Sequence, residues 1–414
     1  MQIILLDETR FDAFAINHPR HNYYQTSNYG RLMTKNGHNA YYLGLVDEIG
    51  DIKAATLMIV KNRKNDKKKM GYCPRGFLID WEDETLVKLF TDSLKDFLYK
   101  RNFTYIKLDP MVIYKEHNLD GSEKGDEYSN LAFTKKLQSL GYIHMGYNNG
   151  MEASKPRWNG LTFMNNDIAR LYNSISKEAR DKIIEAARMG NKVYIGNKND
   201  ITLLFNLINN SVPPIEYYYN YAEFYGNSFE VYFNKLEPIE YVNASKLAYE
   251  KEEENNNMLN MQIQDFNQTN KEMLINEKIK SDERLAKYKR NMLSASRLFQ
   301  QYPSGIETAG VAVIKYGKTI TFLASGINEQ FKDQHPEYLL KWQLMQEFAK
   351  QGYTIVNLGG LTSDFKKDYN SIVKTELANK IVEYVGEFDL VINKKAYYTG
   401  MKLNPIFNWL NTPI

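Results

Sequence analysis

The chain has 414 residues, which is too long for one ordinary hydrophobic core and therefore indicates two or three folded units. Lys and Arg total 53 against 50 Asp and Glu, and this balance neither requires nor excludes a polyanionic partner. The single cysteine, Cys73, excludes a disulfide within the chain and disfavours a cysteine-based metal site. No apolar run approaches the ~20 residues that span a bilayer, and the first residues lack a signal-peptide pattern. We therefore expect a cytoplasmic protein with no transmembrane segment.

The first 150 residues are predicted to alternate strands with helices. Apolar runs bounded by turn residues predict strands, and apolar side chains at helical spacing predict a helix. In chain order these are strands at 44–46, 54–60 and 71–73, a helix over 86–98 and a strand at 106–108. Pro74-Arg75-Gly76 turns the chain after the third strand, and Asp109-Pro110 ends the fourth.

A second unit is predicted from about residue 151. Apolar side chains at helical spacing predict one helix from Asn165 to Arg188, which Gly190 ends. Further elements are strands at 192–195, 310–315, 319–323 and 355–358, a helix over about 339–349, and Gly359-Gly360 as the end of the last strand. Strand pairs followed by a helix and a strand thus occur twice, which predicts two related α/β units of the acetyltransferase type.

Residues 239–302 differ from the rest, because they contain neither Gly nor Pro and are rich in Asn, Gln, Glu, Lys and Met. A 3-4-3-4 spacing of apolar side chains predicts a coiled-coil seam at Leu285, Tyr288, Met292, Ala295 and Phe299. We predict two antiparallel helices that turn near residues 267–271. One long helix or a polar linker are the alternatives.

The predicted fold class is thus α/β (α+β), with two acetyltransferase-like (GNAT-type) units and an inserted antiparallel coiled-coil arm. The first unit is expected at residues 1–150, and the second at 151–242 and 303–395. The arm is expected at 243–302, and residues 396–414 are expected to return to the first unit.

Several motifs together resemble the Fem family of peptidoglycan-bridge aminoacyltransferases. PRGFLIDW at residues 74–81 and KLDP at 107–110 are similar to the family patterns PRGPxxDY and IxxDP, and GEFDLVIN at 386–393 is similar to GEFDxVLN. Lys155-Pro156-Arg157 is similar to the family's QPR, and the arm to the seryl-tRNA-synthetase-like arm of staphylococcal members. The resemblance covers nearly the whole chain.

Two motifs depart from the family pattern. The segment Val373–Ala378 replaces FKxxFG and keeps only the lysine, Lys374. The segment Val212–Ile215 replaces RDGF and lacks the arginine that would hold an acceptor phosphate.

The resemblance implies an enzyme that transfers an amino acid from aminoacyl-tRNA to the stem peptide or growing cross-bridge of a peptidoglycan precursor. The acceptor would be lipid II or a UDP-linked muropeptide, with no metal and no coenzyme A, and peripheral contact with the inner membrane face stays open. The alternatives are a non-catalytic or diverged paralogue that acts as a bridge-altering immunity or resistance factor, and a coenzyme A-dependent N-acyltransferase. The sequence lacks the pyrophosphate loop that the last alternative requires.

The resemblance also suggests the catalytic residues. Lys374, expected in a loop before a strand, would meet the tetrahedral oxyanion or the tRNA ribose. Asp109 would take a proton from the attacking amine or orient that amine. A surface lysine and a turn-capping aspartate are the structural alternatives.

Four further residues are candidates for substrate binding. Arg31 and Lys35 are suited to hold acceptor phosphates, and a solvated helix face is the alternative. Tyr217 and Tyr218 belong to a tyrosine cluster that would line a sugar or peptide cleft, or else pack in the core.

Overall fold

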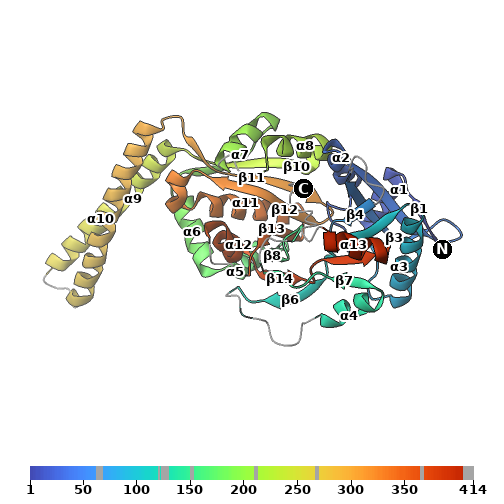
Figure 1. Cartoon of the computed structure of the whole chain (residues 1–414). Coiled ribbons are helices and arrows are strands. Elements are labelled where there is room, and N and C mark those ends of the chain that lie inside the picture. The colour runs from blue at the N-terminus through green and yellow to red at the C-terminus, as the bar shows by residue number, and fades with distance from the viewer. Residues whose placement is uncertain are drawn as a thin grey trace.

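A computed structural model describes residues 1–61, 69–119, 122, 130–149, 153–208, 213–265, 270–363 and 368–403. Two mixed β-sheets with helices around them form the body of the molecule, and a long pair of helices projects from it (Figure 1). The fold is therefore mixed α/β with two sheets, as the sequence predicts.

The first sheet has seven strands in the order β1-β2-β3-β4-β5-β15-β7. Its strands are β1 (Gln2–Leu5), β2 (His38–Val46), β3 (Ile52–Lys61), β4 (Lys69–Cys73), β5 (Phe103–Leu108), β15 (Phe388–Val391) and β7 (Tyr142–His144). The helices of this part of the chain are α1 (Glu8–Asn17), α2 (Ser27–Lys35), α3 (Glu84–Tyr99) and α4 (Leu131–Ser139). All strands pair antiparallel except β4 and β5, which α3 connects in parallel.

The second sheet has eight strands in the order β6-β14-β8-β13-β12-β11-β10-β9. Its strands are β6 (Ile113–His117), β14 (Lys380–Tyr384), β8 (Trp158–Phe163), β13 (Ile355–Leu361), β12 (Thr319–Ile327), β11 (Ile306–Tyr316), β10 (Phe229–Leu236) and β9 (Asn191–Ile195). The helices of this unit are α5 (Ile168–Ser174), α6 (Lys177–Ala187), α7 (Ile201–Leu207), α8 (Ile215–Tyr225), α11 (Pro336–Lys350) and α12 (Tyr369–Leu377). The last helix, α13 (Lys394–Leu403), contacts β5 of the first sheet.

The two sheets repeat one pattern. In each, four antiparallel strands lead to one parallel pair, β4 and β5 in the first sheet and β12 and β13 in the second. One helix connects each parallel pair, α3 or α11, and its apolar face packs in that sheet's core. This repeat agrees with the predicted twofold succession of strand pair, helix and strand.

The two units also exchange strands. β6 lies early in the chain but pairs with β14 at the edge of the second sheet. β15 lies near the end of the chain but is inserted between β5 and β7 of the first sheet. Neither sheet is therefore formed by one continuous part of the sequence, whereas the exact borders of the two units stay a prediction.

A shared hydrophobic cluster joins the two units. Phe11 and Tyr29 of the first unit lie in one buried cluster with Tyr221, Phe233 and Ile314 of the second. Burial of these large apolar surfaces from water stabilises the relative position of the sheets. That position matters because a cavity of the protein is lined from both units.

Two local predictions are wrong. The single helix predicted over 165–188 is two helices, α5 and α6, because Ile175 is extended and the Ser176 hydroxyl caps the second helix by accepting a bond from the Ala179 N–H. Gly359-Gly360 does not end its strand, because β13 continues to Leu361 through a bulge at which Gly359 has a φ of 99°.

The projecting arm consists of α9 (Pro238–Gln264) and α10 (Lys271–Gln301), which pack side by side (Figure 1). The prediction of two helices is confirmed, and the predicted seam residues on α10 are buried or half-buried. A polar contact lies within the pair, where the Asn256 amide donates to the Ser281 hydroxyl at 3.0 Å. The predicted turn falls largely on residues 266–269, outside the described residues, as do residues 404–414 of the expected C-terminal segment.

The arm is attached between two strands that pair directly with each other, β10 and β11. We therefore expect that a short Gly-Ser linker in place of residues 243–301 leaves the body folded, with one cooperative transition and a stability change of about 1–2 kcal/mol. Urea unfolding followed by circular dichroism measures this. A matched linker in place of residues 168–187, which bury Leu171, Ala179 and Ile183, should abolish cooperative unfolding. Loss of cooperativity in the arm variant would contradict the expectation.

Candidate functional site

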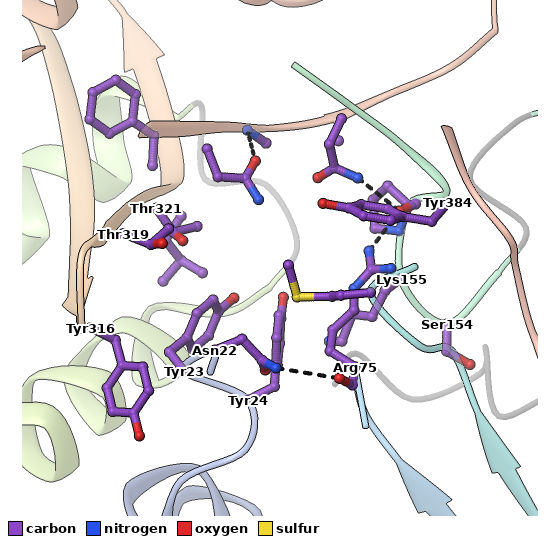
Figure 2. Close-up of a pocket in the computed structure, with 18 of the residues that line it drawn as sticks. Asn22, Tyr23, Tyr24, Arg75, Ser154, Lys155, Tyr316, Thr319, Thr321 and Tyr384 are labelled. Atoms are coloured by element: carbon purple, nitrogen blue, oxygen red, sulfur yellow. Dashed lines mark hydrogen bonds between the residues drawn. The ribbon is translucent and has the colours of Figure 1, made fainter. Parts of the chain in front are cut away.

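A cavity of about 300 Å³ lies between the two units (Figure 2). The first unit contributes the loop between α1 and α2 and the turn after β4, and the second contributes α8 and strands β8 and β11–β14. The lining includes tyrosines, amides and hydroxyls from distant parts of the chain: Asn22, Tyr23, Tyr24, Tyr217, Tyr316, Thr319, Thr321, Asn357 and Tyr384. Such a mixture of aromatic and hydrogen-bonding groups suits a polar organic ligand.

One end of the cavity is cationic, because Arg75 and Lys155 both line it. Arg75 has a φ of 54°, a left-handed conformation at the turn after β4. Its guanidinium donates a hydrogen bond of 2.7 Å to the Pro156 carbonyl and stacks 4.9 Å from the Tyr384 ring centre. These contacts from the second unit fix the arginine of the PRG motif in place.

The carboxylate of Asp109 holds Arg75 in position through direct contacts. At the end of β5, its carboxylate accepts hydrogen bonds from the Arg75 backbone N–H at 2.7 Å and from the Tyr72 hydroxyl at 3.0 Å. Arg75 Nε lies 3.7 Å from its other oxygen. Burial raises the pKa of Asp109 to about 6, although Arg75 opposes this shift. Asp109 is thus buried next to the cavity wall and contacts one of the residues that form it.

Lys155 is positioned by a buried ion cluster. Lys107 on β5 lies 3.1 Å from Glu387 and 3.3 Å from Asp389, at the strand that returns to the first sheet. The second oxygen of Glu387 accepts a bond of 2.7 Å from the Ser154 backbone N–H. The next residue, Lys155, then directs its ammonium into the cavity region, 4.5 Å from the Tyr24 ring centre.

Lys374 does not lie in a loop, as the sequence suggested, but in the last turn of α12. The local reason is that Asp368 caps this helix by accepting a bond from the Ser371 N–H. The Lys374 ammonium donates a bond of 2.9 Å to the carbonyl of Gly360, and Gly359 and Gly360 both line the cavity. Burial, followed by the charge of Lys341, lowers the pKa of Lys374 to about 8.

Of the four residues predicted to bind substrate, only Tyr217 is among those that line the cavity. Tyr217 lines the cavity, whereas Tyr218 is buried in the cluster that joins the units. Arg31 and Lys35 lie outside the cavity wall on α2, where they pair with Glu8 and Glu223, and the Arg31 side chain is 51% exposed.

Sequence reasoning missed much of the wall. Tyr23 and Tyr24 follow α1, Thr319 and Thr321 belong to β12, and Tyr384 ends β14. These residues come together only through the packing of the two sheets, and no local pattern marks them. Arg75 and Lys155 could have been found, because each belongs to a motif that the sequence analysis names.

Known proteins resemble this chain over nearly its whole length. The model of the FemAB family matches residues 6–403. The chain belongs to the FemAB family. It is 23% identical to aminoacyltransferase FemA of Staphylococcus aureus strain bovine RF122 / ET3-1, over 97% of this chain and 98% of that relative. It is 22% identical to FemA of strain MW2, with the same coverage.

A solved structure shares the fold. The crystal structure of FemX superposes on this FemAB-family chain with a TM-score of 0.75 at 19% identity, covering 96% of this chain and 99% of that one. Within the described residues, no group of three or more His, Cys, Asp or Glu side chains is arranged to hold a metal ion. None of the helices in the described part of this FemAB-family chain has the length and apolar character needed to span a bilayer.

The raised pKa of Asp109 makes its contribution to the stability of this FemAB-family protein depend on pH. Between its ordinary pKa of 3.8 and about 6, the folded state holds a proton that the unfolded chain has lost. The contribution is therefore fully present below about pH 4 and is lost as pH rises through about 6. We expect the difference in unfolding free energy, wild type minus Asp109→Asn, to fall over this range in urea titrations.

The control is His18→Gln. Burial, with Arg20 and His21 nearby, lowers the pKa of His18 to about 4, so the unfolded chain binds the extra proton between about pH 4 and 6.5. The wild type minus His18→Gln difference should therefore rise with pH, opposite to that of Asp109. A wild type minus Asp109→Asn difference that rises with pH would show that Arg75 stabilises the ionised carboxylate more than burial disfavours it.

Proposed function

We propose that this protein transfers an amino acid from aminoacyl-tRNA to an amine of a peptidoglycan precursor, on the stem peptide or on a growing cross-bridge. The observation that carries the proposal is the placement of the Lys374 amine behind the Gly359–Gly360 wall of a cavity built by both units. Its relatives are named aminoacyltransferase FemA, which supports the same class of reaction.

The reaction replaces an ester by an amide. The acceptor nitrogen attacks the ester carbonyl carbon, a C–N bond forms, and the bond from that carbon to the ribose oxygen breaks. The attacking amine loses one proton and the ribose oxygen gains one, so the overall proton count is unchanged. The protein needs to align the two substrates and stabilise the charge that develops on the carbonyl oxygen.

We assign Lys374 to the reacting groups, because its ammonium lies behind the Gly359–Gly360 wall, where it donates a hydrogen bond to the Gly360 carbonyl. Tyr217 and the other tyrosines of the cavity bind the precursor through ring faces and hydroxyls. Arg75 and Lys155 receive an anionic group of a substrate at the cationic end.

Asp109 has a different place in this proposal from the one first expected. Its contacts with Tyr72 and Arg75 make it a positioning residue that acts through Arg75. The suggestion that Arg31 and Lys35 hold acceptor phosphates stays a prediction. It would require an acceptor that extends beyond the cavity to α2.

The direct test is to incubate the protein with a mixed pool of labelled aminoacyl-tRNA and with lipid II or a UDP-linked muropeptide. We expect label in one of the two acceptors, separated by chromatography, and the labelled amino acid identifies the donor. A parallel reaction with labelled acetyl coenzyme A should leave both acceptors unlabelled. Label from the coenzyme alone, or from neither donor, would overturn the proposal.

Lys374→Met should lower the transfer rate by roughly two to three orders of magnitude, because one lost charged contact to an oxyanion costs about 2.7–4 kcal/mol. The methionine retains most of the aliphatic stem, so the fold should remain intact by circular dichroism. Lys177→Met, an exposed lysine on α6, is the matched control and should transfer at the wild-type rate. Equal rates in the two variants would show that Lys374 is not part of the reacting groups.

A further inference from the structure

An ion pair is fully buried in the core of the second unit. Glu337 and Lys341 lie one turn apart on α11, and their side chains are each only 1% exposed. The Lys341 ammonium donates a bond of 2.5 Å to Glu337 Oε1, and the Ser325 hydroxyl of β12 donates to the same oxygen at 2.7 Å. Within the described residues, the other oxygen of Glu337 has no hydrogen-bond partner.

Stability alone does not explain this pair. Its neighbours on α11, Tyr338, Leu340 and Leu344, belong to the hydrophobic core. Removing two charges from water costs several kcal/mol per ion, and an apolar pair of similar volume in such a place is often as stable or more stable. Two charges placed inside an apolar core therefore call for a role outside packing.

The reactive lysine of the proposed function lies on a helix that packs against α11. Lys374 is on α12, which packs against α11, and its pKa responds to Lys341 first among the neighbouring charges, then to Glu337 and Asp368. A methyl group built on Gly359 would lie 3.5 Å from Lys374 Nζ, so this amine lies against a glycine that lines the cavity.

Within the described residues, the acidic side chains of α12 and its cap have partners, and Asp368 accepts a bond of 2.7 Å from the Ser371 hydroxyl. Glu376, on the same helix, accepts bonds of 2.7 Å from the Lys182 ammonium of α6 and from the Tyr338 hydroxyl of α11. Strands β8 and β13, which pack against α12, contain no charged residue. Within the described residues, the Glu337–Lys341 pair is therefore the fully buried pair of charges on the helix that packs against α12 from the core.

We propose that Glu337 and Lys341 are positioning residues for Lys374, which hold a fixed positive charge behind its ammonium and so prepare it to release a proton into the cavity. This inference rests on the proposed function. In that reaction the Lys374 N–H bond breaks as an O–H bond forms on the leaving ribose oxygen. The amine then regains a proton that the attacking nitrogen has released to solvent, so the enzyme returns to its starting state.

The test follows the Lys374 amine without any substrate. A short pulse of acetic anhydride from about pH 6 to about pH 10, followed by mass spectrometry of the Lys374 peptide, gives the pH at which half of the amine is reactive. We expect a midpoint near 8 in the wild type. In Lys341→Met it should rise by about one pH unit or more, because a like charge is removed. Lys350→Met, at the exposed end of α11, should leave it unchanged.

A second variant guards against loss of the fold. Lys341→Met leaves Glu337 buried and unpaired, whereas Glu337→Gln combined with Lys341→Met removes both charges and keeps the volume. Lys341 has the larger influence on Lys374, so the midpoint should still rise in the double variant, by less than in the single one. A wild-type midpoint in the folded variants would overturn the inference.

Transfer assays separate this inference from the function on which it rests. A lysine that donates a proton gives an activity that falls as pH rises past its midpoint, and this limb should move upward with the labelling midpoint in the folded variant. A shift in labelling with no transfer by the wild type would refute the proposed function alone. The positioning role would be refuted if the labelling midpoint moved in the variant while its transfer activity still fell at the same pH as in the wild type.

Discussion

The buried ammonium of Lys107 joins two strands that lie far apart in the sequence, β5 and β15. Although burial opposes its charge, Asp389 and Glu387 raise the pKa of Lys107, so it remains an ammonium between two carboxylates. One carboxylate belongs to β15 and the other directly precedes it, which fixes the strand between β5 and β7. Because Glu387 also binds the Ser154 N–H, the closure of the first sheet and the wall of the cavity depend on the same few charges. An unpaired charge at this depth would be strongly destabilising.

Local signals in the sequence carried much of the fold. The paired strands β2 and β3, the helix α3 and the two helices of the arm each depend on periodicity and on turn residues, which act over short distances. The failures occurred where a local rule competes with tertiary structure. A glycine pair usually ends a strand, yet β13 continues through Gly359 because β8 keeps pairing with it as far as Leu361. Apolar spacing continued across Ser176, and only its capping bond reveals the break.

The candidate site likewise contains some residues that the sequence could predict and others that it could not. Lys374 and Asp109 could be selected because they lie in motifs, and the structure places both of them close to one cavity. The wall itself could not be predicted, because residues such as Tyr24 and Tyr384 are more than three hundred positions apart in the chain and meet only through the packing of two sheets. The buried partners of Lys374 were equally hidden, since Glu337 and Lys341 on α11 have the spacing of an ordinary surface ion pair.

The insertion of β15 has a consequence for the growing chain on the ribosome. When the first 150 residues have been made, β5 and β7 have no strand between them, and both present unpaired backbone groups. The missing strand emerges only after the arm and the whole second sheet have been synthesised. The sheet of the first 150 residues therefore lacks one strand through most of translation, and the four-residue strand β15 can fill this gap only after the second unit has been synthesised.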